Sequence, residues 1–599
     1  MRTRLRTKIT GALASAVLGA AALAGCSSSS SSDSEEETGG SSSSAAASVD
    51  GSQKAAAVLA ADKEAHEGDW DESGAEDVAL DGKTVTLTEG GTYRLSGKLS
   101  DGQVLVDAPG QKVTLILDGV DISSSSGAAI AATEVEELVV VLADGSANTL
   151  SDADSYAEDE DANAALFSAG DLTVGGEGSL TVHGNGNDGI AGKDGLVIAS
   201  GTVTVEAADD GVRGKDYLVV KGGSVKVSAQ GDGLKADNTE DKTAGYIALT
   251  AGTVQVTAAG DGVDAATDLV VTGGTLDVTA KATDDSSAHA LKSGVITVLE
   301  KGTVEVDASA DGLHSDAAVH LAGAEVTVAA GDDGVHAEGD LVISGGTVAV
   351  TRSNEGLEGK DITVAGGSTK VTSGDDGVNA SGSTTSSDDQ GGGQDGGQGG
   401  GPGGGGPGAG GGGGGGGGGE SVGDFSLQVT GGTLVIDADG DGFDSNGTAE
   451  ITGGTLVVNG PEMGGNGALD VNGSFTVGGG VLLAAGSAGM AVAPDEESGQ
   501  GWLSVTLDST VAAGTTLHVV DSDGEVVASY VTSKAIQNVV YSSKAVKSGS
   551  EYRIYSGGKA SGDETGGMYT AGDLDGADEI ATVTAGDAPE GGFGGGPRR

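Results

Sequence analysis

Short runs of alternating apolar and polar residues recur along most of the chain. A glycine is followed by Thr-Val-x-Val or a close variant, as in Thr202–Val205, Thr253–Val256 and Thr303–Val306. Runs of three to five residues with a period of two and many β-branched side chains predict β-strands. Frequent glycine disfavours helix. The pattern therefore predicts an all-β protein.

The glycines that begin these runs are regularly spaced. They are Gly178, Gly201, Gly223, Gly252, Gly274, Gly302, Gly323, Gly346, Gly367, Gly432, Gly454 and Gly480. The successive spacings are 23, 22, 29, 22, 28, 21, 23, 21, 65, 22 and 26 residues, so a period near 22 dominates. A unit of this length cannot bury its own apolar face, but stacked units can. The sequence predicts a parallel β-helix whose coils stack at a spacing of ~4.8 Å.

In-register stacking would place equivalent side chains on top of one another. A first interior ladder is expected from Val203, Val225, Val254, Leu276, Val304, Val326, Val348, Leu434 and Leu456. A second is expected from Val205, Val227, Val256, Val278, Val306, Val328, Val350, Ile436 and Val458. The polar residues between them would point outward, namely Thr204, Lys226, Gln255, Asp277, Glu305 and Thr327. Glycine is expected where the chain turns between faces with positive φ.

The N-terminus has the pattern of an export and anchoring signal. Four basic residues precede the apolar run Ile9–Ala22, and Leu-Ala-Gly-Cys then ends at Cys26, which matches the bacterial lipobox. The run is too short to span a bilayer comfortably. We expect a signal peptide over 1–25, a lipid on Cys26, and an extracytoplasmic protein anchored to the bacterial cell membrane. Residues 26–75 predict a flexible tether, with one short helix possible over 54–67.

The remaining chain divides by composition. The β-helix is expected over 76–499, with less regular first coils, and a Gly-rich insertion over 382–420 is expected to be disordered within one coil. At about residue 500 the repeat stops and tyrosines appear in longer alternating runs. Residues 500–585 therefore predict a small C-terminal β cap, and 586–599 a disordered tail.

Composition excludes several classes of protein. The chain has 599 residues with 114 Gly but only 7 Pro and no three-residue period, which excludes collagen. The formal net charge is -60, so nucleic acid is excluded as a direct partner because its phosphates would be repelled. A single Cys excludes an internal disulfide framework.

Aspartate recurs in an Asp-Gly-Val or Asp-Gly-Leu motif nine or ten residues after most of the glycines. Stacked like charges destabilise a sheet. The side chains could cap backbone N–H groups in their own turn, pair with Arg213, Lys215 or Lys235, or bind Ca²⁺ between coils. The candidate calcium ligands are Asp209, Asp210, Asp232, Asp261, Asp264, Asp332, Asp333, Asp375, Asp376, Asp439, Asp441 and Asp444.

Two histidines follow this motif at equivalent positions. His314 and His336 are 22 residues apart and should stack, and His289 could join them. Such a column is either a transition-metal site or a solvated histidine stack.

Several segments resemble a known family. Gly91–Gly97, Leu115–Val120 and the Asp-Gly motifs are similar to bacterial carbohydrate-binding domain-containing proteins, first described from a cellulose-degrading clostridium, over roughly residues 65–560. The resemblance implies a right-handed parallel β-helix similar to pectate lyases, bound calcium, and polysaccharide as the partner, either cellulose or an acidic polymer. The candidate carbohydrate contacts are Arg213, Lys215, Lys235, His314 and His336.

Three functions remain open from the sequence. The first is a non-catalytic polysaccharide-binding module, although Trp70 and Trp502 form no aromatic row of the kind that crystalline cellulose binders use. The second is a calcium-dependent, pectate-type lyase in which Arg213, Lys215 or Lys235 is the base. The third is a structural surface adhesin.

Overall fold

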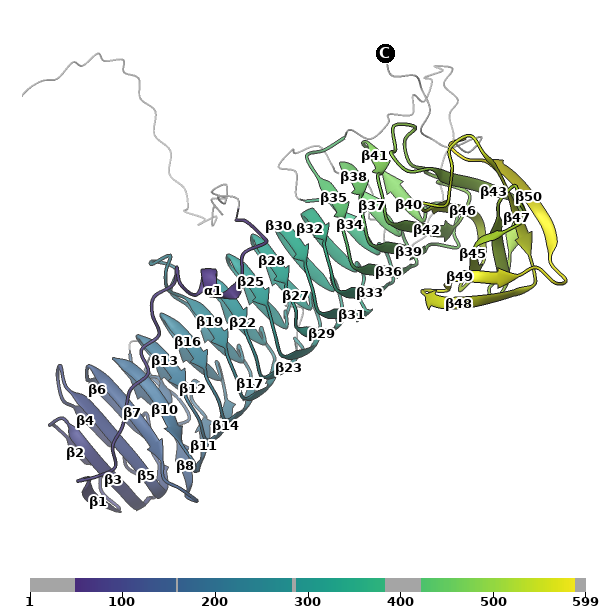
Figure 1. Ribbon diagram of the computed structural model, residues 1–599. Coiled ribbons are helices and arrows are strands. Elements are labelled where there is room, and N and C mark those ends of the chain that lie inside the picture. Colours follow the sequence, from purple (N-terminus) through teal and green to yellow (C-terminus); the bar gives the residue numbers. More distant parts are fainter. Residues whose placement is uncertain (1–48, 158–159, 283–286, 383–421, 588–599) are drawn as a thin grey trace, which may run out of the picture. The chain divides into compact units, whose positions relative to one another are not determined.

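The fold consists of stacked coils followed by an antiparallel C-terminal module (Figure 1). The computed structural model describes residues 49–157, 160–282, 287–382 and 422–587. Within these ranges the chain forms fifty strands and one short helix, α1 (Ala55–Val58). That helix is not long or apolar enough to cross a membrane. The predicted signal peptide and Cys26 lie outside the described residues.

Each coil contributes one strand to each of three parallel sheets, which we number in chain order within a coil. Sheet 1 holds the Thr-Val-x-Val runs. It contains β8 (Ala147–Ser151), β11 (Ser179–Gly184), β14 (Thr202–Ala207), β17 (Ser224–Ala229), β20 (Thr253–Ala258), β23 (Thr275–Ala280), β26 (Thr303–Ala308), β29 (Glu325–Ala329), β31 (Thr347–Arg352), β33 (Ser368–Ser373), β36 (Thr433–Ala438), β39 (Thr455–Asn459) and β42 (Val481–Gly486).

Sheet 2 follows the Asp-Gly motif, and its strands are mostly short. It contains β2 (Val85–Leu87), β4 (Val104–Asp107), β6 (Ile130–Glu134), β9 (Ala164–Ser168), β12 (Asp188–Gly192), β15 (Val212–Gly214), β18 (Leu234–Ala236), β21 (Val263–Ala265), β24 (Leu291–Ser293), β27 (Leu313–Ser315), β34 (Val378–Ala380), β37 (Phe443–Ser445) and β40 (Leu469–Val471).

Sheet 3 completes each coil. It contains β7 (Glu137–Leu142), β10 (Asp171–Gly176), β13 (Gly195–Ile198), β16 (Tyr217–Val220), β19 (Tyr246–Leu249), β22 (Asp268–Val271), β25 (Ile296–Leu299), β28 (Ala318–Leu321), β35 (Ser426–Val429), β38 (Thr448–Ile451) and β41 (Phe475–Val477). Long strands bend between sheets: β1 (Glu76–Asp81), β3 (Gly91–Leu99) and β5 (Lys112–Ser123) run from sheet 3 into sheet 1, and β30 (Val335–Ile343) and β32 (Leu357–Val364) from sheet 2 into sheet 3. The predicted parallel β-helix is confirmed.

The core follows the predicted register. Val203 pairs with Val225 and Val225 with Val254, and the first ladder continues in this way to Leu456. In the coil between Val348 and Leu434 these places are taken by Thr369 in the first ladder and Val371 in the second, and both are buried. The space between three closely packed sheets suits aliphatic side chains, which explains the scarcity of aromatic residues.

Glycine serves two different purposes in the coils. At ten of the twelve coil heads it adopts positive φ, as at Gly223 (φ 77), whereas Gly178 and Gly323 do not. In the Asp-Gly motif φ is not positive, and the reason is space: a Cβ on Gly233 would lie 2.1 Å from Val256 Cγ1 and 2.5 Å from the Gly262 carbonyl oxygen. The expectation that turn conformation explains the glycines therefore holds at most coil heads, whereas close packing explains those of the Asp-Gly motif.

The segment 49–75, expected to be part of a flexible tether, instead packs along sheet 3 (Figure 1). We call it the N-terminal strap. Ala55 and Val58 of α1 pack on β22, β25 and β28, and Trp70 packs on β5 and β7. Lys63 pairs with Asp194 and Asp216. The physical reason is that sheet 3 is apolar on its outer surface too, as Val219 and Val270 are, so it requires a cover.

The C-terminal module, β43 to β50, consists of antiparallel strands. Strand β46 (Ile536–Ser542) pairs with β42 of the last coil and with β43 (Trp502–Val511). A separate six-stranded sheet has the order β48 (Lys559–Thr565), β49 (Met568–Asp573), β45 (Val526–Val531), β44 (Thr516–Val520), β47 (Glu551–Ser556), β50 (Asp578–Thr584). The module covers Val457 and Leu483 on the outer surface of sheet 1, and Tyr530 Oη donates to Asn459 Oδ1 at 2.6 Å.

Candidate functional site: an open polar face and a charged band

The three outer surfaces of the β-helix differ in what they offer a ligand. The strap covers sheet 3, and the C-terminal module covers the last coils of sheet 1. Earlier coils of sheet 1 remain open, and sheet 2 carries ionisable side chains. The candidate sites are therefore the open part of sheet 1 and the charged surface of sheet 2.

The open face of sheet 1 presents the predicted outward row in register. Lys226 lies between Thr204 and Gln255 on neighbouring strands, and Asp277 and Glu305 continue the row. These side chains are exposed or half-buried. The row therefore offers hydrogen-bonding groups that repeat at the strand spacing of ~4.8 Å. Among the described members of this row none is aromatic.

Next to sheet 2, the aspartate of each Asp-Gly motif and the residues at the equivalent position of other coils form a stack that we call the turn ladder. Its members on successive coils are Asp188, Asp210, Asp232, Asp261, His289, Asp311, Asp333, Glu355, Asp376 and Asp441. Oδ1 of Asp210 accepts the N–H of Asp232 at 2.9 Å, and Oδ1 of Asp232 accepts that of Asp261 at 2.7 Å. These carboxylates do cap backbone N–H groups, as expected. The capped N–H belongs to the next coil and not to the aspartate's own turn, because stacking places the N–H of the next coil directly beside the carboxylate.

A second column runs parallel to the turn ladder, three residues later in each coil. We call it the sheet 2 column. Its members are Arg213, Lys235, Asp264, Lys292, His314, His336, Glu358, Asn379, Asp444 and Asp470. The turn ladder and this column together form one charged band.

The first coils of the band are neutralised by basic side chains. Arg213 lies 2.7 Å from Asp188, Lys235 lies 2.6 Å from Asp232 and 3.2 Å from Asp210, and Lys292 lies 3.1 Å from Asp261. Burial disfavours the ammonium form of Lys235, but the neighbouring carboxylates outweigh it and hold its pKa above the ordinary value. Burial raises the pKa of Asp188 to about 6 despite its pairing with Arg213.

Lys215, the remaining candidate contact, lies outside this column. It follows β15 in the turn toward sheet 3, where its backbone N–H donates to the Gly192 carbonyl oxygen at 3.0 Å. The structure therefore brings together four of the five predicted carbohydrate contacts.

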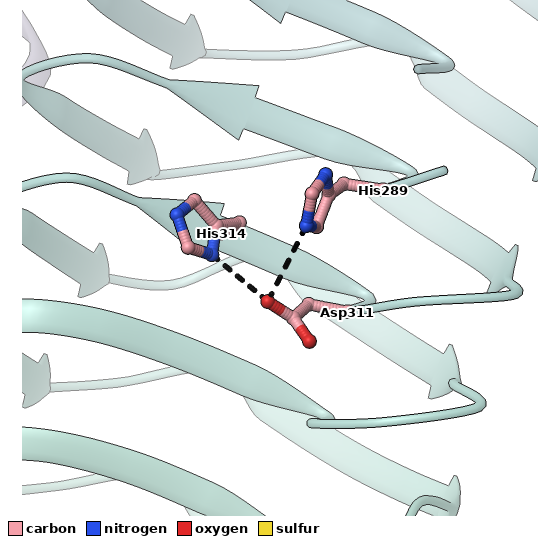
Figure 2. Close-up of side chains that lie close together, drawn as sticks. All are labelled: His289, Asp311 and His314. Atoms are coloured by element: carbon pink, nitrogen blue, oxygen red, sulfur yellow. Dashed lines mark hydrogen bonds and ion pairs between the residues drawn. The ribbon is translucent and has the colours of Figure 1, made fainter. Parts of the chain in front are cut away.

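The middle of the band contains the predicted histidine column. The ring centroids of His289 and His314 are 4.8 Å apart and tilted, and those of His314 and His336 are 5.0 Å apart in an edge-to-face arrangement. All three rings surround the Asp311 carboxylate (two of them in Figure 2). Burial disfavours the imidazolium form of His314, but hydrogen bonds to Asp311 and Asp316 outweigh it and raise the pKa to about 9.

The last coils of the band are acidic, and their carboxylates are not neutralised by basic side chains. Among the described residues, no lysine or arginine lies within ion-pair distance of Glu355, Glu358, Asp376 or Asp444. Burial and the neighbouring carboxylates raise the pKa of Asp376 to about 7 and that of Asp444 to about 8. Carboxylate oxygens of Asp333, Glu355 and Glu358 lie within 4.8 Å of one another.

Sequence reasoning missed Glu355, Glu358, Lys292 and the position of His289 in the turn ladder. A signal was present, because Glu355-Gly356-Leu357 and His289-Ala290-Leu291 stand where other coils have Asp-Gly-Val. Conversely, the predicted ligands Asp209, Asp332, Asp375 and Asp439 lie beside the band and are exposed, and Asp439 pairs with Lys534 at 2.9 Å.

Comparison with known proteins identifies the family. The model of a family described as carbohydrate-binding domain-containing protein matches residues 81–334 and 329–393, together just over half of the chain. The chain belongs to this carbohydrate-binding family. A curated member from Acetivibrio thermocellus is 38% identical over 135 residues, which cover 22% of this chain and 47% of that protein. The chain thus matches about half the length of this relative.

Among solved structures, one titled "Structure of the polysaccharide lyase-like protein from C. thermocellum, Gadolinium derivative" is 28% identical to this carbohydrate-binding family member. The match covers 45% of this chain and 95% of that one, with a TM-score of 0.34.

We predict that the protein loses thermal stability between pH 6 and pH 9 in a chelator. The folded pKa values of Asp376 and Asp444 lie above those of unfolded aspartate, so their stabilising effect is present at low pH and is lost as pH rises through about 7 and about 8. His314 has the same sign and loses its effect through about 9. Each such group contributes about 1.4 kcal/mol per pH unit between its unfolded and folded pKa.

Melting followed by circular dichroism at several pH values measures this effect. Asp444→Asn should melt at a temperature that falls less steeply with pH than that of the wild type. Asp107→Asn, an exposed carboxylate on β4, is the control and should keep the wild-type slope. Equal slopes for wild type and Asp444→Asn would contradict the raised pKa of Asp444.

Proposed function

We propose that this protein binds polysaccharide, without cleaving it, along the open face of sheet 1. The observation that carries the proposal is that the open coils of sheet 1 combine exposure with an in-register row of uncharged and charged hydrogen-bonding side chains. Membership of the carbohydrate-binding family supports the same function. A polymer with many equivalent hydroxyl groups suits a surface whose donors and acceptors repeat from coil to coil.

The chemistry of the face bears on the choice of polymer. Lys226 and Gln255 offer donors, whereas Asp277 and Glu305 offer acceptors, so hydroxyl groups of a neutral chain such as cellulose could be bound from both sides. An acidic polymer would be repelled by the carboxylates unless cations bridged them. Because the row lacks aromatic platforms, binding would depend on many weak polar contacts along a long chain.

The lyase alternative is less well supported by the basic residues of the band. A general base for β-elimination must lose its proton near the working pH. Lys235 and Arg213 are held in their charged forms by Asp232 and Asp188, and their pKa values are raised. These two candidate bases are therefore occupied in neutralising the turn ladder.

The binding face can be tested with a double variant. Lys226→Ala with Gln255→Ala removes two adjacent exposed donors, and we expect binding to immobilised polysaccharide to weaken at least several-fold with an unchanged melting temperature. Lys544→Ala, an exposed lysine of the C-terminal module, is the matched control. Affinity electrophoresis through cellulose derivatives and polygalacturonate, with calcium or EGTA, provides the measurement.

Two results would contradict the proposal in different ways. Equal binding by the double variant and the wild type would exclude this face. Steady accumulation of unsaturated uronate from polygalacturonate, followed by ultraviolet absorbance, would favour the lyase. Failure of the wild type to bind any polymer would leave the adhesin.

We also propose that Ca²⁺ binds the acidic coils of the band. Ca²⁺ takes six to eight oxygen ligands. Asp333, Glu355 and Glu358 could supply closely spaced carboxylates. Asn379, in register between Glu358 and Asp444, is only 9% exposed, yet its Oδ1 accepts no hydrogen bond, so this oxygen could serve as a further Ca²⁺ ligand. A bound Ca²⁺ would offset the repulsion that raises the carboxylate pKa values here.

Calorimetric melting with and without EGTA tests the calcium proposal. We expect calcium to raise the melting temperature by many degrees, since saturation at 100 times the Kd corresponds to about 2.7 kcal/mol. Glu355→Gln with Glu358→Gln should abolish most of this shift, whereas Asp107→Asn should retain it. Identical transitions of the wild type in calcium and EGTA would refute the proposal without affecting the binding face.

The sequence also leads us to propose that the protein is an extracytoplasmic lipoprotein. The lipobox motif ending at Cys26 supports this location. In a bacterial host, the full chain should partition into the detergent phase of a phase-separating extract, and Cys26→Ser should move to the aqueous phase. A wild type found in the aqueous phase would contradict lipid attachment.

A further inference from the structure

One carboxylate oxygen in the charged band is surrounded by imidazole nitrogens. Asp311 Oδ2 lies 2.8 Å from His314 Nδ1, 3.6 Å from His289 Nε2 and 3.7 Å from His336 Nδ1. The first two contacts are drawn in Figure 2. His314 follows Asp311 by three residues in the same coil, whereas His289 belongs to the preceding coil. Ligand atoms of His289, Asp311 and His314 all lie within 4.8 Å of one another.

The other ring nitrogens of the two histidines are also held. His289 Nδ1 lies 3.1 Å from Asp261 Oδ1, and His314 Nε2 lies 3.3 Å from Asp316 Oδ1. Histidines that bind metal almost always donate their second N–H to a carboxylate or carbonyl, which fixes the tautomer and aims the free nitrogen at the ion. Here Asp261 and Asp316 contact the other nitrogens of the two rings. As a result, His289 Nε2 and His314 Nδ1 face the same oxygen of Asp311.

The cluster stands out from the rest of the band. The ladder carboxylates of the preceding coils are neutralised by Arg213, Lys235 and Lys292. Among the described residues, no lysine or arginine forms an ion pair with Asp311 or Asp333. Lys292 lies in the coil of His289, but it pairs with Asp261 of the coil before. Imidazoles fill these places in three successive coils, and one of them, His289, replaces an acidic member of the turn ladder itself.

We propose that His289 Nε2, His314 Nδ1 and Asp311 Oδ2 bind a divalent transition-metal ion of the Zn²⁺ type. A tetrahedral Zn²⁺ with bonds of about 2.0–2.1 Å requires ligand atoms about 3.3–3.5 Å apart. The contacts of 2.8 Å and 3.6 Å to Asp311 Oδ2 lie on either side of this spacing. The two imidazole nitrogens lie within 4.8 Å of each other, so they must approach by at most about 1.5 Å to bind one ion. The ion displaces the proton shared by His314 and Asp311, and the charge of Asp311 remains balanced.

Accessibility and donor type fit such an ion. The side chains of His289 and His314 are 16% and 17% exposed and that of Asp311 is 7% exposed, so the ion can enter from solvent and retain a water as its fourth ligand. His336 Nδ1 is the protein donor best placed to replace that water. Imidazole nitrogen suits zinc, whereas Ca²⁺ prefers oxygen. The site is therefore distinct from the acidic coils and independent of polysaccharide binding.

The test uses the full chain, treated with EDTA and then freed of it, and ZnCl₂ alone as the titrant. Isothermal titration calorimetry should detect one tight Zn²⁺ per chain, and excess Ca²⁺ should not displace it. Co²⁺ in place of Zn²⁺ should give the visible absorption of a tetrahedral site. Zn²⁺ should also raise the melting temperature, since it links successive coils.

His289→Gln and His314→Gln should each weaken Zn²⁺ binding at least 10-fold while keeping the wild-type circular dichroism spectrum. His183→Gln, which alters a half-buried histidine on sheet 1, is the matched control and should bind as the wild type does. The proposal is overturned if the wild type binds no Zn²⁺, if Co²⁺ gives only an octahedral spectrum, or if both variants bind Zn²⁺ with unchanged affinity.

Discussion

In-register stacking of like residues is the constraint on which the whole structure depends. Each coil hydrogen-bonds to the next with the same register, so each side chain lies on its counterpart about 4.8 Å away. For apolar residues this is favourable, and the two valine-rich ladders form a continuous core. For ionised residues it is unfavourable, because the same spacing brings like charges together. Stacking therefore stabilises the apolar interior and destabilises the charged band.

The charged band contains three local solutions to this single problem. Every capped N–H in the turn ladder gives a carboxylate one stable partner, and what differs from coil to coil is the group that meets its second oxygen. Lysine and arginine do so in the early coils, histidine in the middle, and further acids in the late coils. The backbone is nearly the same throughout. The side chain three residues after the ladder residue therefore decides whether the charge of a coil is neutralised by a basic group, depends on the protonation of a histidine, or stays negative.

The sequence predicted the parts of the structure that repetition encodes. The register of Val203, Val225 and Val254 was readable because a period near 22 residues leaves one consistent alignment. The N-terminal strap was not, since its affinity for sheet 3 resides in Val219, Val270 and Tyr246, which face outward where a soluble coil would be polar. Consecutive apolar residues in sheet 3, in contrast to the alternation in sheet 1, were the available signal. The partners of each aspartate could not be assigned because hydrogen bonds between coils depend on which side of a turn the carboxylate occupies.

The path of the strap has a mechanical consequence. The strap begins beside β30, where Gly51 N–H donates to Asp340, and runs back along the coils until Glu72 reaches Arg94 on β3. A pulling force applied at residue 49 therefore acts first on a contact in the middle of the stack, far along the chain from the first coil. Its bonds to successive coils would break one after another, as in a zipper, so the energy of a pull would be dissipated in small steps. The first coil would feel tension only after the strap had been peeled away.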